Sequence, residues 1–283
     1  MIDLHTHSTA SDGTFSPKEL VYLAKKEGLQ ALALTDHDTT LGLEEAYYTA
    51  EDLKLPFLCG VEISVKFDGP GHFHLLGYFL TPKLDFLQET LKELHIAREK
   101  RNLQMIEKLK NLGIEITLEE VGSIAQGEIG RPHFARLLVE KGVVKSFEEA
   151  FEKYLRKGAP AYVPKAILDP QVALEKILHS GGIPVLAHPI TLKLKRDELI
   201  KYLENLVELG IKGVEVFYSE HNKDFTQFLF EKAKYFKLLI TGGSDFHGVN
   251  KPDIKLGKGF GNLSIPYEYF EELYKALIDL NSK

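Results

Sequence analysis

Short apolar runs alternate with amphipathic segments through most of this 283-residue sequence. The run A-L-A-L-T at residues 31–35 is apolar almost throughout, as expected of a parallel strand covered on both faces. Repeated strand and helix units predict an α/β fold with a parallel sheet and right-handed crossovers. Further strands are predicted at residues 56–64, 73–80, 184–187, 213–217 and 238–241, with a short one at the N-terminus and another within 257–265.

The alternation is interrupted once, in the middle of the chain. Residues 85–112 form a long, charged helical pattern, and two more helices are predicted at 131–141 and 146–155. We therefore predict a barrel domain of residues 1–82 and 158–283. Residues 83–157 are predicted to form a small inserted helical domain that covers the site and contacts the substrate.

Composition excludes several classes of protein. A net charge of −6 argues against stable DNA binding, and no apolar run approaches the roughly 20 residues of a membrane span. Met1 leads directly into a polar segment, so no signal peptide is expected. The single cysteine, Cys59, excludes an internal disulfide and a cysteine-rich zinc site. The expected compartment is the cytoplasm.

Side chains suited to metal binding follow many of the predicted strands. His5 and His7 lie two residues apart, so on a strand they share one face, and Asp12 follows on a Ser-Asp-Gly turn. Candidates at the ends of six strands favour a closed β/α barrel, predicted to have seven strands, over an open sheet with one switch point. The full candidate set is His5, His7, Asp12, His37, Glu62, His74, His188, Asp245 and His247.

Nine candidate ligands exceed what one ion can use, so we expect two or three divalent ions. Glu62 and Asp245 are the expected bridging carboxylates. Histidine with Asp or Glu suits Mn²⁺, Fe²⁺ or Zn²⁺, of which we expect Mn²⁺. Asp36 and Asp38 flank His37 and are predicted to orient imidazoles by hydrogen bonds.

The motifs H-T-H-S-T-A-S-D-G, T-D-H-D-T, G-V-E-I-S, H-L-L-G-Y, A-H-P and G-G-S-D-F-H-G occur in this order along nearly the whole chain. Together they resemble the PHP (polymerase and histidinol phosphatase) phosphoesterase family. The resemblance implies a distorted (β/α)7 TIM-like barrel with a trinuclear metal site. Ile190 after A-H-P departs from the glycine frequent in the family, which leaves the shape of that loop open. The implied ligand groups are His5, His7, Glu62 and Asp245 for one ion, Asp12, His37 and His247 for a second, and Glu62, His74 and His188 for a third.

The motif G-R-P-H-F-A at residues 130–135 resembles the insertion motif of enzymes that hydrolyse nucleoside 3′,5′-bisphosphates and short 5′-phosphorylated RNA. This resemblance implies that Arg131 and His133 bind substrate phosphate, and arginine suits phosphate through its planar fork. A surface salt bridge is the alternative for Arg131. Lys157 is either a further phosphate contact or an exposed lysine. His221 is either an assisting general acid or a polar loop residue.

The first functional hypothesis is therefore a metal-dependent phosphoesterase in which a metal-bound hydroxide attacks the 3′-phosphate of a nucleoside 3′,5′-bisphosphate, or trims RNA from its 5′ end. The runner-up is a histidinol-phosphate phosphatase or another small phosphomonoesterase. A non-catalytic metal-binding module would have degenerate ligands, whereas all nine positions are filled here. A metal-dependent amidohydrolase would require a bridging lysine on a strand, and none falls suitably among these motifs.

Overall fold

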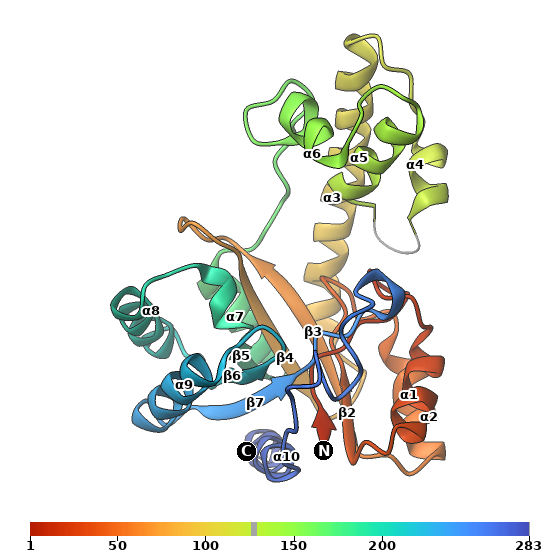
Figure 1. Ribbon diagram of the computed structural model, residues 1–283. Helices are drawn as coiled ribbons and strands as arrows, with labels where there is room; N and C mark the ends of the chain where they lie inside the picture. The colour runs from red at the N-terminus through yellow and green to blue at the C-terminus, as the bar shows by residue number, and fades with distance from the viewer. Residues whose placement is uncertain (126–128, 283) are drawn as a thin grey trace. The chain divides into compact units, whose positions relative to one another are not determined.

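The computed structural model describes residues 1–125 and 129–282. The chain forms two compact units (Figure 1). The first combines Met1–Thr90 with Ile167–Lys283, and the second is Leu91–Ala166. Each unit has a hydrophobic core of its own, and each is described separately below.

The first unit is built on a seven-stranded sheet whose strands follow one another in chain order. Its edges meet, because Leu4 N donates to Gly242 O (3.1 Å) and Asp245 N donates to His5 O (2.9 Å). The sheet is thus a nearly closed barrel, which confirms the predicted seven strands. The strands are β1 (Ile2–Asp3), β2 (Ala31–Leu34), β3 (Phe57–Val65), β4 (Phe73–Phe79), β5 (Ile183–Leu186), β6 (Gly213–Tyr218) and β7 (Leu239–Gly243).

One strand runs against the others, so the expectation of a wholly parallel sheet is wrong. β4 pairs antiparallel with both β3 and β5. The reason lies in the connection between β3 and β4, residues 66–72, which contains Gly69-Pro70-Gly71 and is too short for a crossover helix. The two strands therefore form a long hairpin, in which Glu62 pairs with Leu76.

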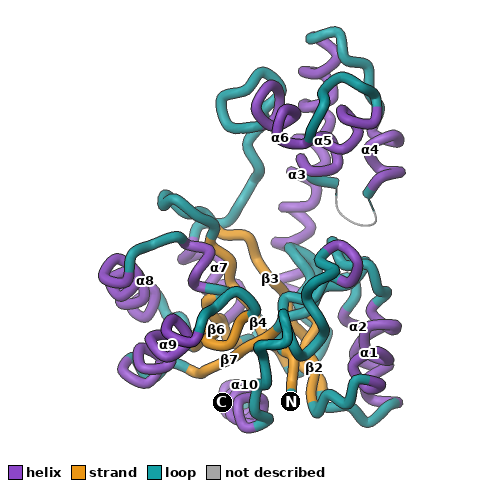
Figure 2. Tube along the Cα trace, viewed as in Figure 1, coloured by secondary structure: helices purple, strands orange, loops and turns teal. Residues whose placement is uncertain are grey.

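Helices surround the strands of this unit (Figure 2). Ser16 begins the first one as predicted, because its hydroxyl accepts from Glu19 N (3.2 Å) while its own N–H donates to the Glu19 carboxylate (2.8 Å). The predicted strand within 257–265 is absent from the described structure, since Gly257, Gly259 and Gly261 adopt positive φ and turn the chain instead. The helices are α1 (Pro17–Lys26), α2 (Leu43–Asp52), α7 (Pro170–His179), α8 (Arg196–Glu208), α9 (Lys223–Tyr235) and α10 (Glu268–Asn281), with short 3₁₀ turns at Pro189–Leu192 and Gly248–Asn250.

The barrel interior is apolar away from the ligand-bearing end. Ile2, Leu4 and Tyr78 are fully buried, and the Tyr78 hydroxyl donates to Leu4 O (2.8 Å). Phe270 and Leu273 of α10 belong to the same core cluster. The polar residues of the strand ends therefore stand on a packed base, which limits their freedom to move.

The second unit is helical throughout its regular structure. Met105, Phe134 and Leu138 are fully buried in its core. The predicted helix at 146–155 is present but changes from α to π geometry partway along. Within the described residues, no helix combines the length and the apolar character that crossing a membrane requires. The helices are α3 (Asp85–Asn111), which begins in the first unit, α4 (Leu118–Ile124), α5 (Arg131–Glu140), α6 (Phe147–Ala150) and a π-helical turn (Phe151–Leu155).

Candidate metal centre

Glu62, on β3, is the centre of the candidate site. Its side chain is fully buried, and both carboxylate oxygens face imidazole nitrogens. Five imidazoles from separate parts of the chain surround it, which is a far larger number than one carboxylate needs for an ion pair. Oε2 lies 3.2 Å from His5 Nε2, 3.2 Å from His7 Nε2 and 3.1 Å from His37 Nδ1, whereas Oε1 lies 2.7 Å from His74 Nδ1 and 2.6 Å from His188 Nε2.

The structure brings all nine candidate ligands into this one cluster. His188 lies beside His74, because their ring centroids are 5.2 Å apart and both imidazoles face the same Glu62 oxygen. Three groups have nitrogen and oxygen atoms close enough to share an ion, within 4.8 Å of one another: His5, His7, Glu62 and Asp245; His7, Asp12, His37 and His247; and His37, Glu62 and His74.

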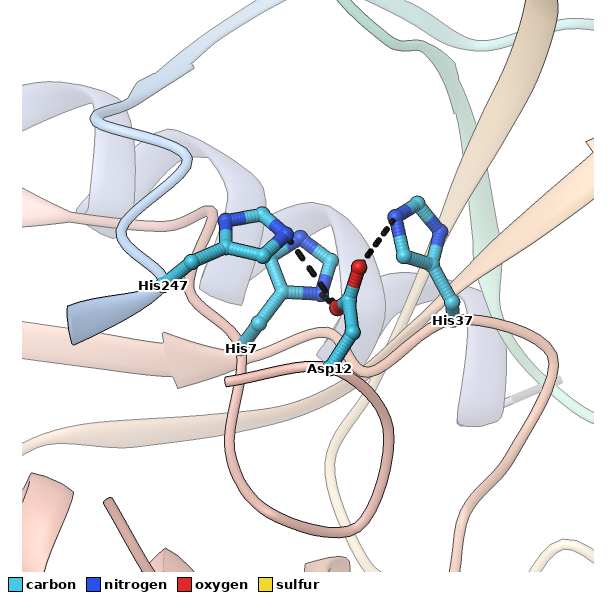
Figure 3. A group of neighbouring side chains, drawn as sticks. All are labelled: His7, Asp12, His37 and His247. Carbon is cyan, nitrogen blue, oxygen red and sulfur yellow. Dashed lines mark ion pairs between the residues drawn. The ribbon is translucent and has the colours of Figure 1, made fainter. Parts of the chain in front are cut away.

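Asp12 lies at the solvent edge of the cluster, among three imidazoles (Figure 3). Its Oδ1 is 3.2 Å from His247 Nε2 and 3.8 Å from His7 Nδ1, and its Oδ2 is 4.0 Å from His37 Nε2. The Asp12 side chain is 48% exposed, whereas Glu62 is fully buried. The group that contains Asp12 therefore has the most exposed member of the cluster, although the His37 (25%) and His74 (24%) side chains are also partly exposed.

Asp36 and Asp38 fix the segments that carry the ligands. Asp36 accepts hydrogen bonds from Ser8 N (2.7 Å), Ser8 Oγ (2.6 Å) and Ser11 Oγ (2.5 Å), and so holds the loop that leads to Asp12. Asp38 accepts from the backbone and hydroxyl of Ser64, two residues after Glu62 on β3. The prediction that Asp36 orients an imidazole by a hydrogen bond is therefore wrong, because Asp36 accepts from Ser8 and Ser11 instead.

Charge in the cluster is strongly coupled. Burial opposes ionisation of Glu62, but the imidazoles of His37, His74 and His5 outweigh it and lower the pKa of Glu62 well below its usual value. Burial likewise disfavours a charged His7, yet the carboxylates of Asp245 and Glu62 beside its Nε2 raise the pKa of His7 to about 9. The carboxylates thus require neighbouring positive charge to remain ionised in a buried site.

The residues present fit bound cations. Both ring nitrogens of His7 are buried without a well-aligned hydrogen bond within the described residues, although Nε2 lies 3.2 Å from Glu62 Oε2 and 3.2 Å from Asp245 Oδ1. Burial, together with repulsion from His7 and His74, lowers the pKa of His37 to about 3 and leaves that imidazole neutral. Neutral imidazoles beside ionised carboxylates are the donor set that divalent ions of the Mn²⁺, Fe²⁺ and Zn²⁺ type take.

Asp245 differs from Glu62 in what its two oxygens face. Oδ1 points into the cluster, 3.2 Å from His7 Nε2. Oδ2 accepts hydrogen bonds from the Tyr218 hydroxyl (3.0 Å) and the Lys251 ammonium (2.6 Å). Glu62 therefore presents two oxygens for bridging, whereas Asp245 has one left.

Several of these supporting residues were not predicted from the sequence. Tyr218 and Lys251 contact Asp245, Thr191 Oγ1 lies 2.8 Å from His188 Nδ1, and Glu215 Oε1 lies 3.0 Å from His5 Nδ1. The one available signal was Glu215, a carboxylate in the apolar strand sequence G-V-E-V-F-Y. An acidic residue there is either exposed on one face or buried with a partner, and the structure has it buried.

His221 is buried behind the cluster. Its Nδ1 hydrogen bonds Val216 O (2.9 Å), its ring lies 5.2 Å from that of Tyr218, and its Nε2 has no partner in the described part of the chain. Burial lowers the pKa of His221 to about 4, so it is neutral at pH 7. Its role as an assisting general acid stays a prediction.

The predicted phosphate-binding residues belong to the second unit. Arg131 is the first residue of α5; it donates to Leu155 O (3.4 Å), and its guanidinium carbon lies 5.4 Å from the centre of the Tyr162 ring. His133 Nδ1 accepts from Gly130 N (3.0 Å) at the start of the same helix. Lys157 is exposed, in the turn that follows the π-helical segment.

A second arginine in this unit was not among the predicted ligands. Arg101 is 6% exposed, and its Nη1 donates to Met105 Sδ (3.2 Å). Burial, with repulsion from Arg98 and Arg131, lowers the pKa of Arg101 to about 10. Among the residues that the structure describes, neither Arg101 nor Arg131 pairs with a carboxylate. Closely spaced guanidinium groups without an acidic partner are suited to binding an anion.

Comparison with known proteins agrees with the family resemblance of the sequence motifs. A family model described as PHP domain matches residues 3–163. The chain is 38% identical over 248 residues to a 5′-3′ exoribonuclease from Haemophilus influenzae, a match that covers 87% of this chain and 89% of the relative. It is 36% identical over 248 residues to a 3′,5′-nucleoside bisphosphate phosphatase from Chromobacterium violaceum, with 87% of each covered. Among solved structures, a protein from Bifidobacterium adolescentis described as a metal-dependent phosphoesterase has a TM-score of 0.79 and 30% identity, with 100% of this chain and 98% of that chain covered.

Proposed function

Because the chain belongs to the PHP domain family, we propose that it is a metal-dependent phosphoesterase that removes the 3′-phosphate of nucleoside 3′,5′-bisphosphates. The observation that carries this proposal is the convergence of nine candidate imidazole and carboxylate ligands into one cluster with Glu62 at its centre. Relatives that share 36–38% of their residues with it over most of their length are named for nucleotide bisphosphate or RNA hydrolysis. A non-catalytic module is disfavoured, since every ligand position is filled and clustered.

We propose that the cluster holds two or three divalent ions, with Mn²⁺ expected and Fe²⁺ or Zn²⁺ as alternatives. When bound, such ions activate water as a nucleophile at neutral pH and stabilise charge on the phosphate and its leaving oxygen. Glu62 supports a multinuclear site, because its two oxygens face different sets of imidazoles. Three groups of these side chains could each hold an ion, and His188 lies beside the group that contains His74.

The protein's own residues have separate tasks in this proposal. Glu62, Asp245 and Asp12 provide negative charge at fixed positions. Because Glu62 and Asp245 are buried, their electrostatic attraction for cations is stronger than it would be in water. Tyr218 and Lys251 hold the outer oxygen of Asp245, so its inner oxygen stays directed into the cluster. We assign Arg131 and His133, with Lys157 as a further contact, to binding the substrate phosphate that is not cleaved.

The same chemistry extends to RNA. The 5′-terminal nucleotide of a 5′-phosphorylated RNA has a phosphate on each side of its ribose, as a 3′,5′-bisphosphate does. A site that binds one phosphate and hydrolyses the ester at the 3′ oxygen would therefore trim such an RNA from its 5′ end. We expect the protein to act on this substrate in the cytoplasm.

The direct test is phosphate release by the purified, Mn²⁺-loaded protein. Adenosine 3′,5′-bisphosphate, adenosine 3′-monophosphate, histidinol phosphate and a 5′-phosphorylated tetranucleotide are compared at equal concentration. We expect the bisphosphate to give the highest kcat/KM and the RNA to shorten from its 5′ end. A clear preference for histidinol phosphate, or no hydrolysis of the bisphosphate and RNA by protein that binds Mn²⁺, would contradict the proposal.

A further inference from the structure

Glu215 is a buried carboxylate beside the metal centre that is not among its candidate ligands and that contacts two of them directly. It lies on β6, and its side chain is fully buried. Among the described residues it pairs with no lysine or arginine, so the cost of burying its charge is offset only by hydrogen bonds. Both oxygens of an ionised carboxylate in such a place must accept hydrogen bonds.

Each oxygen of Glu215 holds a different candidate ligand. Oε1 lies 3.0 Å from His5 Nδ1, and Oε2 accepts from the backbone N–H of His188 (2.7 Å). These two histidines come from segments that are far apart in the sequence, after β1 and after β5. One carboxylate thus ties together the two ligands whose rings stack at a centroid distance of 5.5 Å.

The hydrogen bond to His188 supports a strained backbone. His188 has φ 25° and ψ 68°, in the left-handed region that non-glycine residues rarely adopt. Such a conformation persists when its surroundings over-determine it. Here the Glu215 carboxylate holds the amide, and Thr191 Oγ1 lies 2.8 Å from the ring Nδ1, which leaves Nε2 directed at Glu62 (2.6 Å).

The contact with His5 selects one of the two neutral forms of the ring. An ionised carboxylate only accepts hydrogen bonds, so the hydrogen of His5 must be on Nδ1. The lone pair is then on Nε2, which faces Glu62 Oε2 at 3.2 Å. This is the arrangement in which a carboxylate fixes the ring orientation and the donor atom of a metal-binding histidine.

From these contacts we propose that Glu215 is a positioning residue of the metal centre, which keeps the Nε2 atoms of His5 and His188 available to the same group of ions. The inference rests on the metal centre of the proposed function but not on the identity of the substrate. Loss of the Glu215 carboxylate should therefore weaken metal binding more than it weakens substrate binding.

The sharpest variant is Glu215→Gln, which keeps the shape of the side chain. Glutamine has one acceptor and one donor, whereas both neighbours present N–H groups. If its amide nitrogen faces His5, the ring must move its hydrogen to Nε2 and lose the lone pair that faces the cluster. If the amide nitrogen faces His188, two donors oppose each other across a hydrogen bond that supports a strained residue.

Metal binding is measured by isothermal titration with MnCl₂, and bound metal by elemental analysis after gel filtration. We expect Glu215→Gln to bind Mn²⁺ about 10- to 100-fold more weakly than the wild type. At limiting Mn²⁺ its kcat should fall while KM for the bisphosphate stays within about twofold. The matched control is Glu220→Gln, on the exposed turn that follows the same strand, which should bind Mn²⁺ as the wild type does.

A folded Glu215→Gln protein with wild-type Mn²⁺ affinity and stoichiometry would overturn the inference. Circular dichroism in EDTA establishes whether the variant is folded. If it is not, Glu215→Asp provides the test: it keeps two acceptors but is too short to reach both partners, so unchanged Mn²⁺ affinity would again refute the role. Wild-type protein that binds Mn²⁺ without hydrolysing any phosphate ester contradicts the proposed function alone, whereas wild-type protein that binds no Mn²⁺ contradicts both.

Discussion

Replacing Arg131 by alanine separates recognition of the second phosphate from hydrolysis of the first. Arg131 makes one long hydrogen bond, to Leu155 O at 3.4 Å, and packs on the Tyr162 ring, so most of its donors have no protein partner among the described residues. The fork can give a phosphate two charge-assisted hydrogen bonds, each worth about 1.5–3 kcal/mol. Water replaces part of this in the variant, so we take a net loss of roughly 3 kcal/mol, or about 100-fold in kcat/KM.

The assay compares adenosine 3′,5′-bisphosphate with adenosine 3′-monophosphate, which lacks the phosphate assigned to Arg131. The variant should lose about 100-fold in kcat/KM on the first substrate and less than about threefold on the second. Arg136→Ala is the matched control, because Arg136 lies on the same helix and makes only an exposed i,i+4 pair with Glu140 (3.0 Å). Equal losses on both substrates, or no loss on either, would refute the assignment.

Three further outcomes follow from the structure. Removing metal with EDTA should lower the melting temperature, because the buried nitrogens of His7 make no well-aligned hydrogen bond within the described residues and would lose a bound ion. At free Mn²⁺ 100 times Kd one site contributes about 2.7 kcal/mol, or roughly 5–10 °C, and a scanning fluorimetry trace unchanged by EDTA would contradict this. The folded pKa of His221 (about 4) lies below the usual 6.5, so its contribution to stability is present above pH 6.5 and lost as pH falls through 4. His221→Asn, which keeps a donor for Val216 O, should remove a fall of about 3 kcal/mol in the free energy of unfolding between pH 7 and 4; urea titrations with the same pH slope in both proteins would show the reasoning to be wrong. Burial raises the pKa of the Cys59 thiol, so iodoacetamide at pH 8 should modify it only after unfolding, as mass spectrometry would reveal.

The candidate ligands could be found from the sequence because each follows or lies on an apolar run. The carboxyl ends of barrel strands meet at one rim, so residues such as His37 and Asp245 could be placed together without knowing any distance. The direction of β4 could not be obtained in this way, since an apolar run reads the same in a parallel and an antiparallel strand. His74 reaches the site because it is near the start of that reversed strand rather than its end.

Supporting residues were harder to predict for a different reason. Glu215 has apolar neighbours on both sides, and alternation of this kind is also typical of a strand with one exposed face. Only the closed barrel shows that this position is fully buried beside His5. Lys251 reaches Asp245 through a loop in which Gly248 has a positive φ, a geometry that no periodic pattern encodes.

The closure of β1 against β7 has a consequence for how the protein is made. His5 and His7 leave the ribosome well before Asp245 and His247, and the hydrogen bonds that join these segments (Asp245 N to His5 O, 2.9 Å; His7 N to Phe246 O, 3.0 Å) need both. The β3–β4 hairpin can pair as soon as it emerges, but the complete ligand set cannot exist during most of translation. A chain that terminates early, or is clipped before residue 245, therefore has no assembled centre, however well its remaining part folds.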